Sequence, residues 1–287
     1  MECWSYQKLE DGRVECQLCP HHCHISEGKT GICRSRRNRG GVLTSDVYGR
    51  PCSLAIDPIE KKPLYHFHPG TKCLSIACTG CNLRCLNCQN HDISQVSPSE
   101  AGHYNLSPSQ VVELCKEHHC PGIAYTYTEP LTYLEYITDT ARLAHEAGLW
   151  NILVTAGYVC LKPLKTLLPY LDAANIDLKS FSDDIYMKIS GVHLQPILDT
   201  ILAMRDAGVW IELTNLLIPG INDDRQMIRR MCQWIVSSDL ANNPLHFSRF
   251  FPRYKMQHIP PTPIRTLKEA KQIATEEGIL NIYLGNV

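Results

Sequence analysis

The sequence has no excess of charge of either sign and no long hydrophobic run. Its 28 Lys and Arg residues nearly balance 29 Asp and Glu residues, which gives a formal net charge of -1. This balance argues against nucleic acid or an anionic membrane surface as the main partner. No run of about 18 apolar residues occurs, so no transmembrane helix is expected. The first stretch, MECWSYQKLEDGRVEC, is polar and has no signal-peptide core, so we expect a cytoplasmic protein.

Cysteine is the residue that the sequence has in excess. There are 15 cysteines, an odd number in a chain with no secretion signal, which fits a disulfide framework poorly. Reduced cysteines at short spacings more often bind metal ions or clusters. Isolated cysteines such as Cys115, Cys160 and Cys232 lie in apolar or helical surroundings, so we expect them to fill the core.

Three parts of different composition follow one another along the chain. Residues 1–40 are rich in Cys, His, Gly and Arg and show little periodicity, which predicts a small metal-binding module. Residues 41–72 hold several prolines and short strand-like runs, so we expect a connecting strap. Residues 73–287 are expected to form the main domain.

Short apolar runs alternate with amphipathic helical stretches in the main domain. The expected strands are 73–77, 123–127, 151–155, 174–178, 210–218, 245–250 and 281–284. The expected helices are 108–118, 134–148, 161–171, 196–208, 225–238 and 267–278, the first capped by Ser107. This alternation predicts an α/β fold with a parallel sheet. About six repeats fit an open, partial (β/α)6 barrel better than a complete eight-fold one.

The motif that carries most chemistry directly follows the first of these strands. Cys81, Cys85 and Cys88 have the spacing C-x3-C-x2-C. With this cysteine content, the spacing would arise by chance about 0.04 times in such a chain. A [4Fe-4S] cube needs four ligand positions, so three thiolates leave one iron open. An open coordination position is typical of a catalytic metal site.

In its context, G-C-N-L-R-C followed by C-Q-N, the motif resembles that of the radical S-adenosylmethionine (SAM) superfamily. The resemblance implies a radical SAM barrel and a [4Fe-4S] cluster whose open iron chelates the methionine part of SAM. It also implies reductive cleavage of SAM to a 5′-deoxyadenosyl radical, which abstracts hydrogen from a substrate. A structural zinc site completed by Cys78 or a nearby histidine is the alternative.

Three further segments resemble SAM-binding landmarks of that superfamily, and each lies where an expected strand ends. T-E-P resembles the Gly-Gly-Glu motif, in which the acid holds the methionine ammonium. D-L-K resembles the segment that closes on the ribose and carboxylate, and L-I-P-G resembles the one beside the adenine. The residues so implied are Thr128, Glu129, Pro130, Asp177, Lys179 and Ile218. Asn87 departs from the aromatic residue that is common before the third cluster cysteine.

A second group of cysteines lies close to the N-terminus. They are Cys16, Cys19, Cys23 and Cys33. Four soft ligands at this spacing predict either a closed tetrahedral zinc site or a second, fully ligated iron–sulfur cluster. A neighbouring histidine could replace one cysteine, and free thiols are the remaining alternative. The role of such a site would be structural, or electron relay if it held a cluster.

The substrate-binding residues are less well marked. Strand 245–250 is expected to face the barrel interior, with His246 as a proton relay and Arg249 as a grip for an acidic group. Tyr254 follows just beyond this strand. His246 and Arg249 could equally be polar residues of the core or the rim. Residues 60–62, Glu-Lys-Lys, are expected to form a solvated turn.

Longer segments sharpen the resemblance. CQLCPHHCHISEGKTGICRSRRN, DPIEKKPLYHFHPG, GCNLRCLNCQNHDIS, YTYTEP and LHFSRFFPRYKM resemble the radical SAM member of the AmmeMemoRadiSam system. The core of that group is similar to pyruvate formate-lyase activating enzymes. The resemblance implies a link with a Memo-like and an AMMECR-like protein, and a reductant such as flavodoxin or ferredoxin.

The sequence thus leaves three functions open. The first is a radical SAM enzyme acting on an unknown small molecule or on a side chain of a partner protein. The second is a glycyl-radical activase, which takes a backbone hydrogen from a partner enzyme. The third is a non-catalytic metal-binding scaffold.

Overall fold

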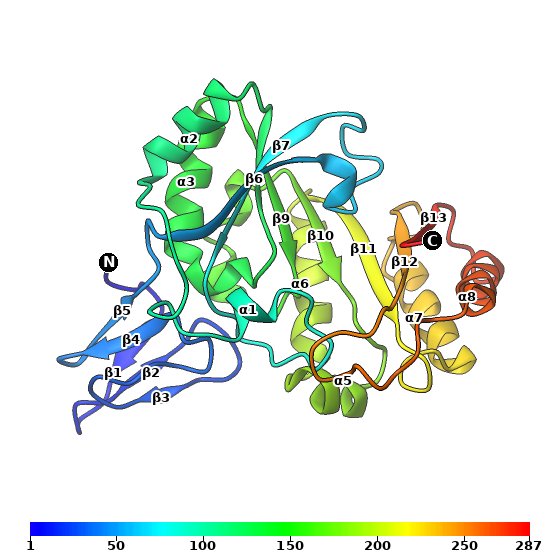
Figure 1. Ribbon diagram of the computed structural model, residues 1–287, viewed down its shortest axis with the longest axis horizontal. Coiled ribbons are helices and arrows are strands. Elements are labelled where there is room, and N and C mark those ends of the chain that lie inside the picture. The colour runs from blue at the N-terminus through cyan, green and yellow to red at the C-terminus, as the bar shows by residue number, and fades with distance from the viewer.

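The computed structural model describes residues 1–287 and is built around one large sheet (Figure 1). The sheet has eight strands in the order β13-β12-β11-β10-β9-β8-β7-β6. All neighbours from β7 to β13 are parallel, and only β6 and β7 run antiparallel. The strands are β6 (Pro51–Pro58), β7 (Lys72–Cys78), β8 (Gly122–Tyr125), β9 (Trp150–Thr155), β10 (Ala173–Asp177), β11 (Trp210–Leu217), β12 (Leu245–Arg249) and β13 (Ile282–Gly285). Because β6 and β13 do not pair, the sheet stays open, and the predicted α/β partial barrel is confirmed.

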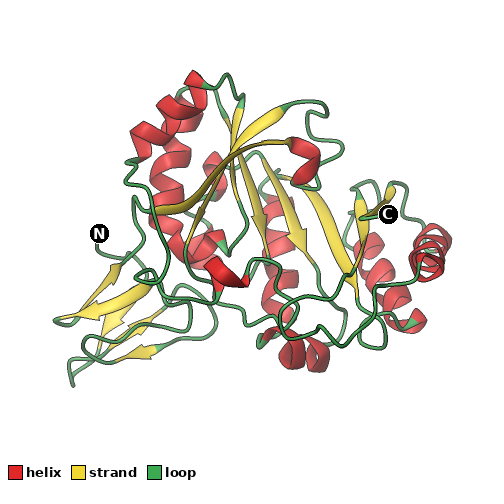
Figure 2. Ribbon diagram, viewed as in Figure 1, coloured by secondary structure: helices red, strands yellow, loops and turns green.

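Helices connect the parallel strands and pack around the sheet (Figure 2). They are α1 (His91–Ser94), α2 (Pro108–Glu117), α3 (Leu134–Glu146), α4 (Leu161–Leu164), α5 (Asp183–Ser190), α6 (Gln195–Asp206), α7 (Arg225–Ser237) and α8 (Ile264–Glu276). Helix α2 begins as predicted, because the Ser107 side chain and the Gln110 amide form a reciprocal capping box. No helix is both long and apolar enough to cross a membrane.

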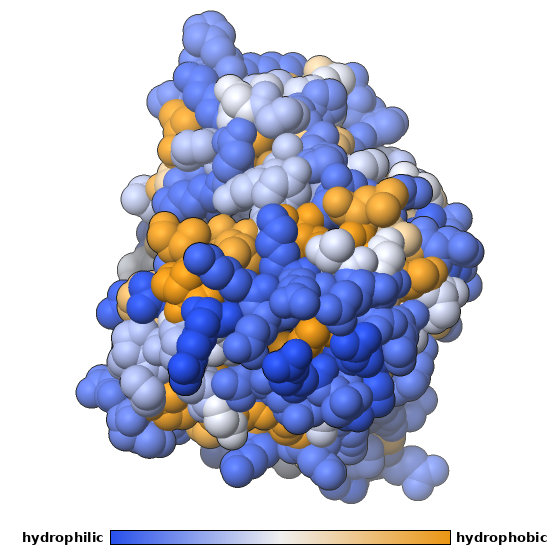
Figure 3. Space-filling model, turned by 90° about the vertical axis from the view of Figure 1, so that its right-hand side faces the viewer, coloured by the Kyte–Doolittle hydropathy of each residue, from blue (hydrophilic) through white to orange (hydrophobic).

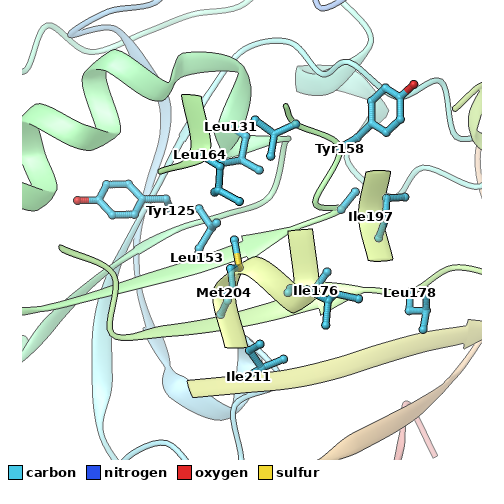
Figure 4. Packing of buried hydrophobic residues seen from close by; sticks show 14 of the residues in the cluster. Tyr125, Leu131, Leu153, Tyr158, Leu164, Ile176, Leu178, Ile197, Met204 and Ile211 are labelled. Atoms are coloured by element: carbon cyan, nitrogen blue, oxygen red, sulfur yellow. The ribbon is translucent and has the colours of Figure 1, made fainter. Parts of the chain in front are cut away.

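The core lies between the strands and the helices that follow them. Figure 4 shows Leu153 of β9, Ile176 of β10 and Ile211 of β11 close to side chains of α6. The side chains of α6 that pack against these strands are Ile197 and Met204, and both are fully buried. The alternation of β-branched strands with amphipathic helices therefore produces this packing, as the sequence pattern indicated.

The N-terminal part forms two small antiparallel sheets beside the main sheet (Figure 1). One contains β1 (Tyr6–Lys8), β2 (Val14–Cys16) and β3 (His24–Ile25), and the other is a hairpin of β4 (Arg36–Arg39) and β5 (Val42–Ser45). The hairpin spans residue 40, and β6 joins the main sheet from within the expected strap. The division into 1–40, 41–72 and 73–287 stays a prediction.

Two expectations about single segments are wrong. The helix expected over 161–171 is only the short α4, followed by a 3-10 turn at Leu168–Tyr170. Pro169 lacks an amide donor and so cannot continue an α-helix. Lys62, expected in a solvated turn, is only 1% exposed.

The face that carries α8 and β13 is mainly hydrophilic, with separate hydrophobic patches (Figure 3). Leu280 is the most exposed large apolar residue of this part after the terminal Val287. Isolated apolar residues of this kind are ordinary on a protein surface.

Candidate functional site

The three cysteines of the C-x3-C-x2-C motif lie in the loop between β7 and α1. Two backbone bonds tie this loop to α5: the amides of Arg84 and Leu86 donate to the carbonyls of Ser190 and Ile189, at 2.8 and 2.9 Å. The Lys255 amide donates to the Leu86 carbonyl at 2.9 Å. The loop is therefore clasped between α5 and the segment after β12, which fixes its position at the carboxyl edge of the sheet.

Each of the three sulfur atoms has a polar neighbour. The Leu83 amide donates to the Cys81 Sγ at 3.3 Å, and the Cys85 Sγ lies 3.3 Å from the Ser190 hydroxyl. The Cys88 Sγ lies 3.1 Å from the hydroxyl of Ser94. Hydroxyl and amide groups beside thiolates are among the protein's means of tuning an iron–sulfur cluster.

Burial affects the protonation of two of these thiols, Cys81 and Cys85. Burial raises the pKa of Cys81, and the nearby Glu129 and Cys85 raise it further. Burial also raises the pKa of Cys85, but there the Lys179 ammonium opposes it. The two free thiols are thus protonated at neutral pH, and binding a metal must displace these protons.

Glu129 follows β8 and links its segment to the end of β9. Its carboxylate is 2% exposed and accepts hydrogen bonds from the Thr155 hydroxyl and the amides of Leu131 and Ala156. Burial raises the pKa of Glu129, and these hydrogen bonds oppose the rise. The neighbouring Thr128 hydroxyl donates to the Cys78 carbonyl at the end of β7, at 2.7 Å.

Pro130 continues this segment as the first residue of a 3-10 turn, Pro130–Tyr133, that leads into α3. The turn fixes the direction in which the chain leaves β8. The T-E-P segment therefore follows shortly after the end of β8, close to where the sequence predicted it.

Asp177 and Lys179 meet at the end of β10. The Lys179 Nζ lies 2.7 Å from Asp177 Oδ2, and both side chains are partly buried. Burial lowers the pKa of Lys179, but Asp177 and Cys85 outweigh burial and raise the pKa above its ordinary value. Lys179 therefore stays charged and lies close enough to lower the pKa of Cys85, a cysteine of the motif.

Ile218 belongs to a small apolar cluster beside the cysteine loop. It packs with buried Ile189, Phe250 and Met256 and with the partly buried Leu86. The Ile218 amide donates to Asn222 Oδ1 at 2.6 Å, which holds the turn after β11. Leu86 thus supplies an apolar surface next to Asn87, where the sequence lacks an aromatic residue.

The structure separates the three substrate candidates. Tyr254 lies at the site, because its ring stacks on His91 at 4.5 Å, just after the cysteine loop. His246 Nε2 lies 2.7 Å from the buried Glu212 carboxylate, three residues before β12 ends. The Arg249 Nε donates to the Thr262 carbonyl at 2.8 Å, so it holds a loop after β12.

A polar group that the sequence analysis missed lies under Tyr127. This residue has a φ of 66°, and its hydroxyl donates to Asp57. The Lys62 Nζ lies 2.6 Å from Asp57 Oδ2 and 4.5 Å from the Tyr127 ring centroid. The Asn90 side chain donates to the Tyr127 carbonyl at 2.7 Å. The sequence did hold a signal for a functional role of Tyr127, because this residue directly precedes the T-E-P segment.

The N-terminal cysteines gather around one small cavity. Cys16, Cys19, Cys23 and Cys33 all line it, together with Arg36 of β4. In this structure no group of three or more Cys, His, Asp or Glu side chains is already arranged as a metal-ligand set. The soft sulfur donors of the two cysteine groups nevertheless suit iron–sulfur clusters or zinc by their chemistry.

Comparison with known proteins places this arrangement in a family. The sequence model described as "Radical SAM superfamily" matches residues 75–232. The chain is 46% identical over 286 residues to Uncharacterized protein MJ0808 of Methanocaldococcus jannaschii, covering 100% of this chain and 85% of the relative.

More distant relatives carry named activities. The chain is 24% identical over 217 residues to the pyruvate formate-lyase 1-activating enzyme of Escherichia coli K12, covering 69% of this chain and 87% of the relative. A radical SAM methyltransferase structure from Sphaerobacter thermophilus is 16% identical with a TM-score of 0.55, over 76% of this chain and 67% of that one. The latter likeness concerns the fold alone.

Proposed function

This chain belongs to the radical SAM superfamily, and on that premise we propose that it binds a [4Fe-4S] cluster on Cys81, Cys85 and Cys88 and acts as a radical SAM enzyme. When bound, such a cluster supplies an electron that cleaves SAM to a 5′-deoxyadenosyl radical, the species that abstracts hydrogen from the substrate. The observation that carries the proposal is a loop with three motif thiols, clasped at the carboxyl edge of a partial barrel.

The surrounding residues have the chemistry that SAM requires. Glu129 offers a carboxylate for the methionine ammonium, since its three hydrogen bonds leave acceptor capacity on the two oxygens. Lys179 offers a charged donor for the methionine carboxylate of SAM, and the ion pair with Asp177 keeps the Lys179 ammonium in place.

The adenine would lie against an apolar surface. Ile218 and Leu86 belong to the same apolar cluster beside the cysteine loop. Leu86 would therefore provide the apolar contact with the adenine that an aromatic residue at position 87 would otherwise provide. Thr128 and Pro130 hold the segment around Glu129 and complete the proposed SAM site.

The test is formation of 5′-deoxyadenosine. Anaerobically reconstituted and reduced protein is incubated with SAM, and the product is measured by chromatography. We expect 5′-deoxyadenosine from the wild type and from Cys232→Ala, a buried cysteine of α7, but not from Cys85→Ala. No product from fully loaded wild-type protein would favour the scaffold function instead.

A glycyl-radical activase is the second candidate function, because the E. coli relative is a pyruvate formate-lyase 1-activating enzyme. Mixing the reduced protein and SAM with a candidate glycyl-radical enzyme should then produce a stable glycyl radical in the partner. Formation of 5′-deoxyadenosine without that radical would leave the enzyme but exclude activation of the partner tested.

The wider context follows from the sequence resemblance. We propose the AmmeMemoRadiSam system, with Memo-like and AMMECR-like partners, a flavodoxin or ferredoxin reductant and a cytoplasmic location. Among the substrate candidates, Tyr254 contacts the segment that follows the cysteine loop, through its stacking on His91. His246 and Arg249 stay substrate candidates by sequence alone. The N-terminal cysteines would hold zinc or a second cluster.

A further inference from the structure

The cavity between the N-terminal cysteines is small and closed in by protein. Its volume is about 10 Å³, and it is lined by the four cysteines with Arg36 and Asn82 among their neighbours. Cys16, Cys19 and Cys33 are each less than a tenth exposed. A cavity of this volume holds about one water molecule. A single metal ion matches this volume, whereas a cube of four irons and four sulfides would require the cysteine side chains to move further apart.

Two residues that line this cavity have a polar atom without a hydrogen-bond partner. These atoms are Arg36 Nη1 and Asn82 Oδ1, both buried. The other two nitrogen atoms of Arg36 each have an acceptor, because Nε donates to the Thr132 carbonyl at 3.0 Å and Nη2 donates to Glu135 at 2.5 Å. A buried guanidinium N–H without an acceptor is unfavourable. A thiolate in the cavity would provide that acceptor, whereas a protonated thiol is a weak one.

We infer that Cys16, Cys19, Cys23 and Cys33 bind one zinc ion, and that Arg36 donates a hydrogen bond from Nη1 to one of the thiolates. Four thiolates around one zinc ion make a closed tetrahedral site of net charge −2, formed with release of the four thiol protons. The Arg36 cation offsets part of this charge. Zinc binds such sites more tightly than ferrous iron does.

The zinc site would support the loop of the catalytic cysteines. Asn82 follows Cys81 directly, its Nδ2 donates to the Tyr158 carbonyl at 2.7 Å, and its own carbonyl lies 2.8 Å from His21 Nε2. Gly80 packs so closely that a Cβ there would lie 2.3 Å from the Cys33 carbonyl oxygen. The zinc ligands and the catalytic loop therefore share one packed interface.

Metal analysis of the purified full chain tests the inference. We expect about one zinc per chain in the wild type and in Cys232→Ser, and none in Cys19→Ser or Cys33→Ser. Zinc should also remain in the triple variant that replaces Cys81, Cys85 and Cys88 by Ala, in which iron is lost. Zinc binding can thus fail or succeed independently of the radical chemistry.

Two results would overturn the zinc site: about eight irons per chain without zinc, or zinc content unchanged by the Cys19 and Cys33 substitutions. If the serine variants fail to fold, Co²⁺ substitution of the wild type decides. Intense sulfur-to-cobalt absorption supports the site, and its absence contradicts it.

Arg36 has its own test, because the matched Arg36→Lys variant keeps the charge but lacks the forked donor. We expect zinc affinity, measured by competition with a chelator, to fall about 10- to 100-fold, the usual effect of losing a residue that orients metal ligands. Unchanged affinity would remove Arg36 from the zinc site.

Discussion

At the residue scale, Lys179 is the charged side chain that interacts with both Asp177 and Cys85. Its ammonium pairs with Asp177 and lowers the pKa of the Cys85 thiol against the effect of burial. One side chain can therefore serve both the cluster loop and a bound carboxylate. The D-L-K segment was identified from the sequence, but its closeness to Cys85 was not, because that contact joins loops from different strands.

We expect Lys179→Met to weaken SAM binding without removing the cluster. Losing one charged hydrogen bond costs about 1.5–3 kcal/mol, so the KM for SAM should rise about 10- to 100-fold. The control is Lys188→Met, which changes an exposed lysine of α5. Iron content and the rate of 5′-deoxyadenosine formation against SAM concentration measure the effect; an unchanged KM would exclude this role for Lys179.

The two lysines that contact Asp57 make a matched pair for a stability test. Lys62 is 1% exposed and Lys61 is 59% exposed, yet both lie within 2.7 Å of the same carboxylate. We expect Lys62→Met to lower the free energy of unfolding by about 3–5 kcal/mol, because it breaks a buried pair. Lys61→Met should cost about 0–1 kcal/mol, as is usual for exposed pairs. Urea denaturation of both variants measures the difference, and equal losses would contradict the buried role of Lys62.

The ion pairs of Asp57 with Lys61 and Lys62 also make the stability of the protein depend on pH. Burial raises the pKa of Asp57, but hydrogen bonds from Lys61, Lys62 and Tyr127 outweigh burial, and the pKa lies below its ordinary value. A lowered carboxylate pKa gives stability that is present above the unfolded pKa of about 3.9 and lost as the pH falls below it. When the pH is lowered from about 6 to about 2, the free energy of unfolding of Asp57→Asn, measured by urea titration, should fall less than that of the wild type. A parallel decline of both would contradict this.

At the element scale, the regular parts of the fold were predictable and the irregular parts were not. The seven parallel strands were expected within one or two residues, because their apolar runs are buried on both faces. Helix α5 was missed because it is short and lies in a stretch without an apolar run. Strand β6 was expected only as part of a strap, since its proline-rich sequence does not show that it adds an antiparallel edge to the sheet.

The packing of Gly80 against the N-terminal module gives a prediction for a whole loop. Gly80 has a φ of 104°, and an added Cβ would lie 2.3 Å from the Cys33 carbonyl oxygen. We expect Gly80→Ala to displace the cysteine loop and reduce both iron and zinc content. Gly102→Ala is the control, because a Cβ there meets nothing within 4 Å. Full metal content in Gly80→Ala would show that this contact does not support either site.

At the scale of the whole molecule, the chain joins an N-terminal cysteine cavity to a partial barrel with a cysteine loop at its carboxyl edge. The order of the motifs along the sequence indicated the barrel edge, since parallel strands end on the same side. The polar group of Tyr127, Asp57 and Lys62 could not be predicted, because it brings a strap, an edge strand and a loop together in space. Long-range contacts of this kind leave no periodic signal in the sequence.

The most direct test of a SAM-binding cluster on Cys81, Cys85 and Cys88 is the electron paramagnetic resonance spectrum of the reduced protein with and without SAM. A cluster on three thiolates has an open iron, so adding SAM should shift the spectrum of a [4Fe-4S] centre. The shift should persist in Cys232→Ser, which changes a buried cysteine of α7 far along the chain from both cysteine groups, and the signal should be lost in Cys85→Ala. A cluster signal that SAM leaves unchanged, or no cluster after anaerobic reconstitution, would contradict the account.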